Sequence, residues 1–147
     1  MTKPLAVITG ASSGIGEATA KAFSNAGYPT LLLARRIELM ESFNLKNSIC
    51  KKIDVRDRDA LVSSIREAEK QYGPTDMMFN NAGVARLADI STQDPSEWDE
   101  MIDVNTKGVM NGIYAVMKDM KARKSGTIVN MSSIAGRKVY GDHTVYC

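Results

Sequence analysis

Residues 5–16 read LAVITGASSGIG, and this stretch decides the fold. Five residues with the composition of a buried strand run directly into a turn that contains three glycines, Gly10, Gly14 and Gly16. From Gly14 to about Asn25 the apolar residues recur at helical spacing, which predicts a helix. Thr30 to Ala34 then predicts a second strand, so the chain opens with one β-α-β unit.

The same alternation of strands and helices continues to residue 131. Further strands are predicted over Ser48–Ile53, Asp76–Phe79 and Thr127–Met131, and helices over Ile37–Phe43, from Asp57 to Tyr72, and from Ser96 to about Arg123. Short Val-, Ile- and Leu-rich strands separated by amphipathic helices are typical of a buried parallel sheet. We therefore predict the α/β class, with a doubly wound parallel sheet that ends at its fifth strand.

Composition limits the kind of partner. The chain has 147 residues, of which 44% are hydrophobic and 24% charged, and its formal net charge is +2. These values predict one globular domain over residues 1–147, with neither a nucleic-acid surface nor a membrane anchor. Cys50 and Cys147 fit no metal spacing, so we expect no metal site, two reduced thiols and a cytoplasmic protein.

The glycine-rich turn has the context of a phosphate-binding site. Glycines let the backbone approach a phosphate closely, and the N–H groups at the start of the following helix favour its negative charge. The alternative is a tight turn in which glycine serves packing alone. A Walker loop is excluded because no Gly-Lys-Ser/Thr sequence ends the turn.

Four motifs occur in an order that resembles the short-chain dehydrogenase/reductase family. They are the Gly-x-x-x-Gly-x-Gly turn after Thr9, the run Asn80-Asn81-Ala82-Gly83, Asn105, and Ser133 with Tyr146. Ser133, rather than Ser132, has the family's spacing to Tyr146. The resemblance covers the whole chain and implies a Rossmann-type fold with a nicotinamide cofactor. The cofactor-binding residues it implies are Gly10, Ser12, Ser13, Gly14, Ile15, Gly16, Arg35, Arg36, Asp54, Val55, Asn80, Asn81, Ala82 and Gly83.

The end of the second strand indicates which nicotinamide cofactor is bound. An acidic residue there would hydrogen-bond the ribose 2′-hydroxyl of NAD, but this chain has Arg35 and Arg36 instead. Guanidinium groups suit a 2′-phosphate, to which Ser12 or Ser13 could add a hydroxyl donor. We therefore favour NADP over NAD. The alternative is that both arginines are solvated charges at a strand end.

The resemblance implies a catalytic set for transfer of a hydride to or from a carbonyl or alcohol substrate. In it Tyr146 is the general acid/base, Ser133 binds the substrate oxygen, and Asn105 helps to hold a proton-relaying water. A tyrosine pKa near 10 must fall by about 3 units for phenolate chemistry near neutral pH, which requires a nearby cation. The family's lysine, four residues after the tyrosine, would fall beyond Cys147.

We therefore expect this chain to be the N-terminal part of a longer single-domain protein. The main alternative is a catalytically incomplete nucleotide-binding fragment, in which Tyr146 is a frayed aromatic and Ser133 a polar strand end. A third possibility is a packing or dimerisation fragment, because the helix predicted from Ser96 resembles the one with which family members pair subunits. That match predicts a homo-oligomer. His143, Trp98 and the methionines are interpreted as structural residues.

Overall fold

The computed structural model describes residues 3–147 and confirms the α/β class, with five parallel strands in one sheet in the order β3-β2-β1-β4-β5. The strands are β1 (Leu5–Thr9), β2 (Thr30–Ala34), β3 (Ser48–Lys52), β4 (Thr75–Asn80) and β5 (Thr127–Asn130). The helices are α1 (Gly14–Asn25), α2 (Ile37–Glu41), α3 (Arg58–Tyr72), α4 (Pro95–Ile102) and α5 (Gly108–Arg123). From β1 the chain adds β2 and β3 on one side of the sheet and then β4 and β5 on the other side, which makes the sheet doubly wound.

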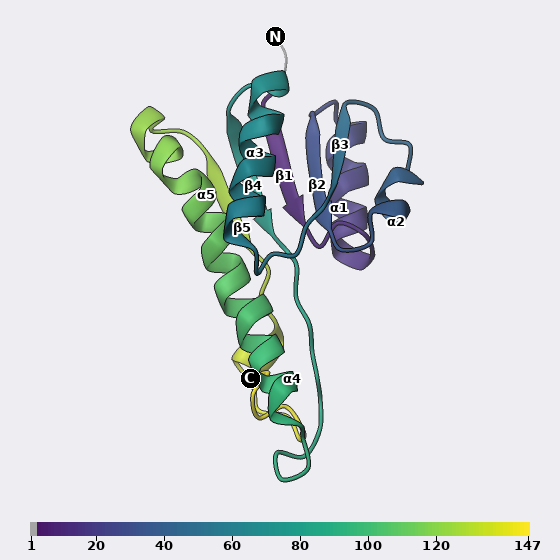
Figure 1. Cartoon of the computed structure of the whole chain (residues 1–147), viewed down its shortest axis with the longest axis vertical. Coiled ribbons are helices and arrows are strands. Elements are labelled where there is room, and N and C mark those ends of the chain that lie inside the picture. Colours follow the sequence, from purple (N-terminus) through teal and green to yellow (C-terminus); the bar gives the residue numbers. More distant parts are fainter. Residues whose placement is uncertain (1–2) are drawn as a thin grey trace.

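Alternate residues of the central strands build a core on each face of the sheet. Leu31 and Leu33 of β2 pack with residues of α3 and α5, whereas Leu32 packs on the opposite face with residues of α1 and α2. Successive side chains of a strand point to opposite faces, so a strand buried on both faces has to be apolar throughout. Figure 1 shows the two helical layers on either side of the sheet.

Local signals set several element boundaries. The Asp57 side chain accepts a hydrogen bond from the Ala60 N–H and caps α3, and the Asp94 side chain caps α4 through the Ser96 N–H. Helix α5 ends at Arg123. The next residue, Lys124, adopts a left-handed conformation with φ of 54°, and Gly126 has φ of 133°. The starts of α3 and α4 and the short return into β5 therefore follow from residues at the helix ends.

The helix predicted from Ser96 to Arg123 differs from the structure in one respect. A π-helical turn, Asp103–Lys107, separates α4 from α5, although the chain stays helical throughout. Figure 1 shows one long rod whose α4 end extends past the carboxyl ends of the strands. Such turns widen a helix by one residue, and they are frequent at functional sites. This one contains Asn105.

Candidate functional site

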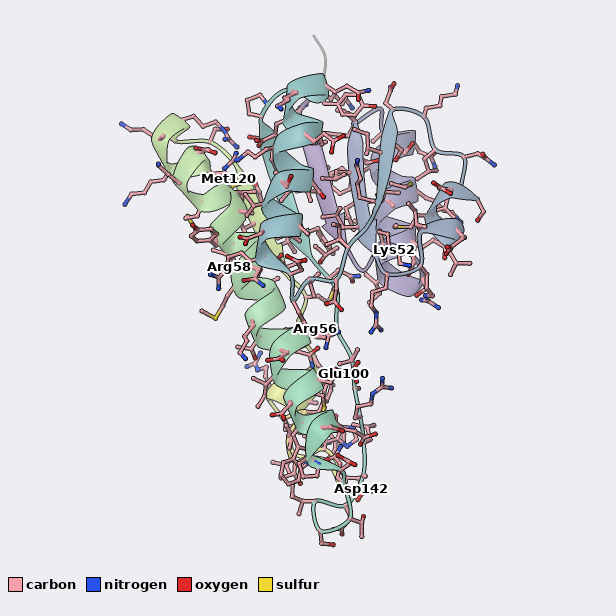
Figure 2. The ribbon with its side chains drawn as sticks, in the orientation of Figure 1. Lys52, Arg56, Arg58, Glu100, Met120 and Asp142 are labelled. Carbon is pink, nitrogen blue, oxygen red and sulfur yellow. The ribbon has the colours of Figure 1, made fainter. Side chains whose placement is uncertain are left out.

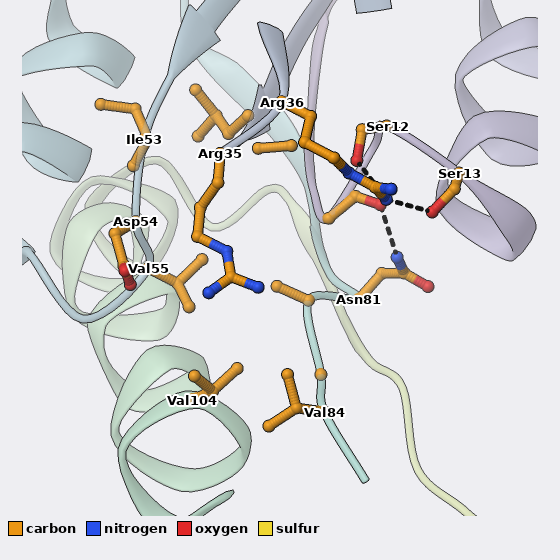
Figure 3. Close-up of a pocket in the computed structure, with 15 residues that line it drawn as sticks. Ser12, Ser13, Arg35, Arg36, Ile53, Asp54, Val55, Asn81, Val84 and Val104 are labelled. Carbon is orange, nitrogen blue, oxygen red and sulfur yellow. Dashed lines mark hydrogen bonds between the residues drawn. The ribbon is translucent and has the colours of Figure 1, made fainter. Parts of the chain in front are cut away.

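A hollow of about 410 Å³ lies at the carboxyl ends of β1, β2 and β4 (Figure 3). It brings together ten of the predicted residues, which are Gly10, Ser12, Ser13, Arg35, Arg36, Asp54, Val55, Asn81, Ala82 and Gly83. The strand order changes direction between β1 and β4. Ligands of open α/β sheets bind at such a point. Sequence spacing and topology therefore point to the same place.

The glycine turn is shaped by close packing as well as by backbone angles. Gly10 and Gly14 have φ of +64° and +58°, a backbone conformation that residues with a side chain rarely adopt. A Cβ on Gly10 would lie 2.7 Å from the Ala82 Cα, and one on Gly16 would overlap the Gly10 carbonyl and lie 2.6 Å from the Asn81 Nδ2. Gly14 and Gly16 do not line this hollow themselves, and they shape the turn that carries the other residues.

Thr9 joins the turn to the segment after β4, and the predicted site set did not include it. Its buried hydroxyl oxygen accepts hydrogen bonds from the Asn81 N–H at 3.0 Å and the Ala82 N–H at 3.1 Å. In return, the Asn81 amide nitrogen donates to the carbonyls of Thr9 at 3.1 Å and Gly10 at 3.3 Å. Only its place directly before Gly10 could have indicated this role from the sequence.

Arg35 and Arg36 point to different parts of the hollow. The Arg36 Nη2 donates to the Ser13 Oγ at 2.9 Å and the Ser12 Oγ at 3.2 Å, so its guanidinium lies beside the glycine turn (Figure 3). The Arg35 Nη1 instead lies 3.8 Å from a carboxylate oxygen of Glu100 on α4. Two cations therefore border the hollow, one against the serine hydroxyls and one extended toward α4.

Asp54 and Val55 form the wall opposite the glycine turn. The Arg56 guanidinium holds the Asp54 carboxylate through its Nε at 2.9 Å and its Nη2 at 2.6 Å. The hydrogen bond from Arg56 is the main cause of the lowered pKa of Asp54, so this carboxylate is an ionised acceptor. The Val55 carbonyl accepts from the buried Asn111 amide of α5 at 2.9 Å. Asn111 is another residue that the sequence did not single out.

Asn80, which was predicted as a cofactor contact, does not line this hollow. Its side chain is buried toward α5, where the amide nitrogen donates to the Asn130 Oδ1 at 2.9 Å and the amide oxygen packs against Gly112. The physical reason is strand alternation, because Asn80 comes two residues after the core residue Met78 and projects to the same face. Its contacts make it a packing residue between the sheet and α5.

A second hollow, of about 550 Å³, brings together the three predicted catalytic residues Asn105, Ser133 and Tyr146. Asn81, Ala82, Gly83 and Val84 line both hollows, so the two are neighbours along one segment. Its apolar lining includes Ile15, Val84, Val109 and Met131. The second hollow is therefore lined by polar and apolar groups in similar measure, and Asn105, Ser133 and Tyr146 are among the polar ones.

Ser133 and Asn105 are both held by backbone groups. The Ser133 Oγ accepts from the Ala135 N–H at 3.2 Å and caps the short 3₁₀ turn Ile134–Gly136, which leaves its O–H proton for donation. The Asn105 amide bonds both backbone groups of Val84, accepting from the N–H and donating to the carbonyl at 2.8 Å each. These two bonds connect the π-helical turn to residues 81–84, the segment that lines both hollows.

Tyr146 is half-buried in a single helical turn. The Cys147 N–H donates to the His143 carbonyl at 2.8 Å, four residues earlier, which is the hydrogen bond of one helical turn. The His143 and Tyr146 rings lie 6.0 Å apart between centroids. Among residues 3–147 no group of acidic, histidine or cysteine side chains could hold a metal ion, and no helix has the length and apolarity to span a bilayer.

Comparison with known proteins agrees with this geometry. The sequence model of the short chain dehydrogenase family matches residues 4–147. An uncharacterised oxidoreductase of Listeria monocytogenes is 42% identical over 146 residues, and the match covers 95% of this chain and 59% of that protein. An acetoacetyl-CoA reductase of Paracoccus denitrificans is 38% identical over 136 residues, with coverage of 91% and 56%.

The fold also matches solved structures. A serine dehydrogenase in a closed form complexed with NADP⁺ superimposes with a TM-score of 0.92 at 29% identity, which covers 97% of this chain and 59% of that one. The chain thus spans somewhat more than half the length of the relatives it matches.

Proposed function

This chain belongs to the short-chain dehydrogenase family, and from that premise we propose that it binds NADP and serves hydride transfer between the nicotinamide and a small carbonyl or alcohol substrate. The observation that carries the proposal is the pair of adjoining hollows, one bordered by a glycine turn and two arginines, the other holding Asn105, Ser133 and Tyr146. That arrangement fits a dinucleotide whose phosphorylated end lies beside the glycine turn and the arginines and whose reactive end lies beside Asn105, Ser133 and Tyr146.

The donor set at the first hollow fits a phosphorylated ribose better than an unphosphorylated one. Arg36 lies against the hydroxyls of Ser12 and Ser13, so a guanidinium and two O–H groups converge on one spot. Charged donors of this kind favour a phosphate dianion. The related serine dehydrogenase that was solved with NADP⁺ supports the same choice.

The second hollow supplies the groups that manage the proton. When bound, a nicotinamide dinucleotide supplies or accepts the hydride. The Ser133 hydroxyl donates its free proton to the substrate oxygen, and Tyr146 exchanges a proton with that oxygen as general acid or base. Asn105 keeps Val84 and the segment around it in place through its two amide bonds.

The cofactor assignment is tested by Arg36→Ala, with Lys52→Ala as a matched control that removes an exposed cation outside the hollow. We expect the NADPH dissociation constant to rise about tenfold in Arg36→Ala, the value of one hydrogen bond to a charged group. NADH binding should change far less, and the control should leave both unchanged. Equal losses for the two dinucleotides would refute a 2′-phosphate contact.

Catalysis is tested by Tyr146→Phe and Ser133→Ala with a panel of ketones and aldehydes. Both variants should keep their NADPH affinity and lose NADPH oxidation, because each removes only a proton donor. An unaltered rate in Tyr146→Phe would remove it from the reaction. NADPH binding without any turnover in the wild type would favour a nucleotide-binding role.

We also propose that copies of the chain pair through one face of α4 and α5. Ile102, Met110, Tyr114 and Met117 leave between 45% and 67% of their surface exposed and recur at helical spacing. An exposed apolar stripe of this kind supports an association surface. Met110→Glu should shift the protein toward monomer in light scattering, whereas Lys46→Glu, a charge change at an exposed residue outside α4 and α5, should not.

A cytoplasmic location and a single domain over residues 1–147 complete the proposal. The two free thiols, Cys50 and Cys147, support a reducing compartment. The hydrophobic cores on the two faces of the sheet both contain residues of β1 and β2. We therefore expect the two cores to unfold together. One cooperative unfolding transition is the expected result in urea, and two separate transitions would argue for two domains.

A further inference from the structure

Glu100 on α4 forms an ion pair with Arg35 of the first hollow, whose charge also acts on Asp54 in the wall. Its Oε1 lies 3.8 Å from the Arg35 Nη1, and its Oε2 accepts a hydrogen bond from the Arg86 Nε at 2.9 Å. Figure 2 shows Glu100 and Arg56 together beyond the carboxyl ends of the strands. The hydrogen bond from Arg86 is the main cause of the lowered pKa of Glu100, with Arg35 and Arg56 contributing through their charge.

The Arg35 side chain extends across the first hollow, from the end of β2 toward α4. Its backbone follows β2 on one wall, whereas Glu100 stands on α4, one helical turn before Val104 on another wall. Figure 3 shows the Arg35 side chain extending from the β2 end toward Val104 and Val84. At 3.8 Å the contact with Glu100 is electrostatic rather than a hydrogen bond, and 58% of the Arg35 side chain is exposed, so Arg35 can leave it at little cost.

We infer that Glu100 competes with the 2′-phosphate of the cofactor for Arg35 and thereby determines how strongly the protein prefers NADPH to NADH; this inference rests on the proposed NADP function. A ribose 2′-phosphate is doubly charged or nearly so, and in this inference it draws Arg35 in beside Arg36 and the hydroxyls of Ser12 and Ser13. The Glu100 carboxylate both occupies that guanidinium and repels the phosphate. The neutral 2′-hydroxyl of NADH meets neither effect, so Glu100 moderates the preference for NADPH.

The test is Glu100→Gln, which removes the charge and keeps an oxygen that can accept from Arg86. Asp99→Asn is the matched control, since it makes the same charge change at the neighbouring position on α4 without an ion pair to Arg35. Dissociation constants for NADPH and NADH are measured on each purified protein at low salt. Glu100→Gln should raise the ratio of the NADH to the NADPH constant about threefold or more, in keeping with an exposed ion pair.

The route through Arg35 is tested in an Arg35→Ala background, where Glu100→Gln should change that ratio much less. An unchanged or lower ratio in Glu100→Gln, or an equal rise in Asp99→Asn, overturns the inference. A wild type that prefers NADH refutes the NADP proposal but leaves the Glu100 effect measurable as a change in the ratio. A wild type that binds neither dinucleotide overturns both.

Discussion

Thr9→Val tests whether the hydroxyl of Thr9 holds the glycine turn against the segment after β4. Valine has nearly the same shape, so the substitution removes the acceptor of two hydrogen bonds, at 3.0 Å and 3.1 Å, without opening a cavity. The Asn81 and Ala82 N–H groups would then lie unpaired in a half-buried place. Leaving a buried donor without a partner costs about 1–3 kcal/mol, so for two partly shielded donors we expect a loss of about 2 kcal/mol.

Urea unfolding followed by circular dichroism measures this loss. With a slope of about 1–3 kcal/mol per M for small proteins, a loss of about 2 kcal/mol moves the midpoint down by about 1 M. NADPH affinity should fall as well, because the same hydrogen bonds set the distance between Gly10 and Ala82. Thr9→Ser is the control, since it keeps the acceptor and gives up only a methyl group, so it should retain NADPH affinity.

If Thr9→Val unfolds at the wild-type urea concentration and binds NADPH as tightly as the wild type, the Thr9 hydroxyl does not hold the glycine turn. If Thr9→Ser loses as much NADPH affinity as Thr9→Val, packing rather than hydrogen bonding holds it.

Three further predictions concern other parts of the fold. Gly16→Ala should lower both stability and NADPH affinity, because its methyl would overlap the Gly10 carbonyl. Gly141→Ala, whose methyl would meet no atom within 4 Å, should change neither in the same titrations. The folded-state pKa of Asp54 is lowered, so its carboxylate stabilises the fold fully above the unfolded pKa and less as the pH falls. The difference in free energy of unfolding between the wild type and Asp54→Asn should therefore shrink below about pH 4. A difference that grows in acid would contradict this. Burial, followed by the charge of Glu41, raises the pKa of Cys50, so its alkylation by iodoacetamide should be slow and should quicken in Glu41→Gln; an unchanged rate would exclude the charge effect.

Residues close to each other in the sequence determined the local structure of this chain. The strand, turn and helix of residues 5–25 follow from an apolar run, from glycines at left-handed positions and from helical spacing. The caps Asp57 and Asp94 act on N–H groups two or three residues away. The α/β class and the place of the glycine turn were predictable because their causes act over a few residues.

The contacts that build the site were decided by tertiary structure. The pairing of β1 with β4 brings Thr9 next to Asn81, 72 residues later, and the crossing of α5 brings Asn111 next to Val55, 56 residues earlier. The same packing directs Arg36 to the serine hydroxyls, Arg35 to Glu100, and Asn80 away from the hollow. Spacing along the chain carries no information on these directions, because they depend on which strands become neighbours and on which face of the sheet each side chain projects.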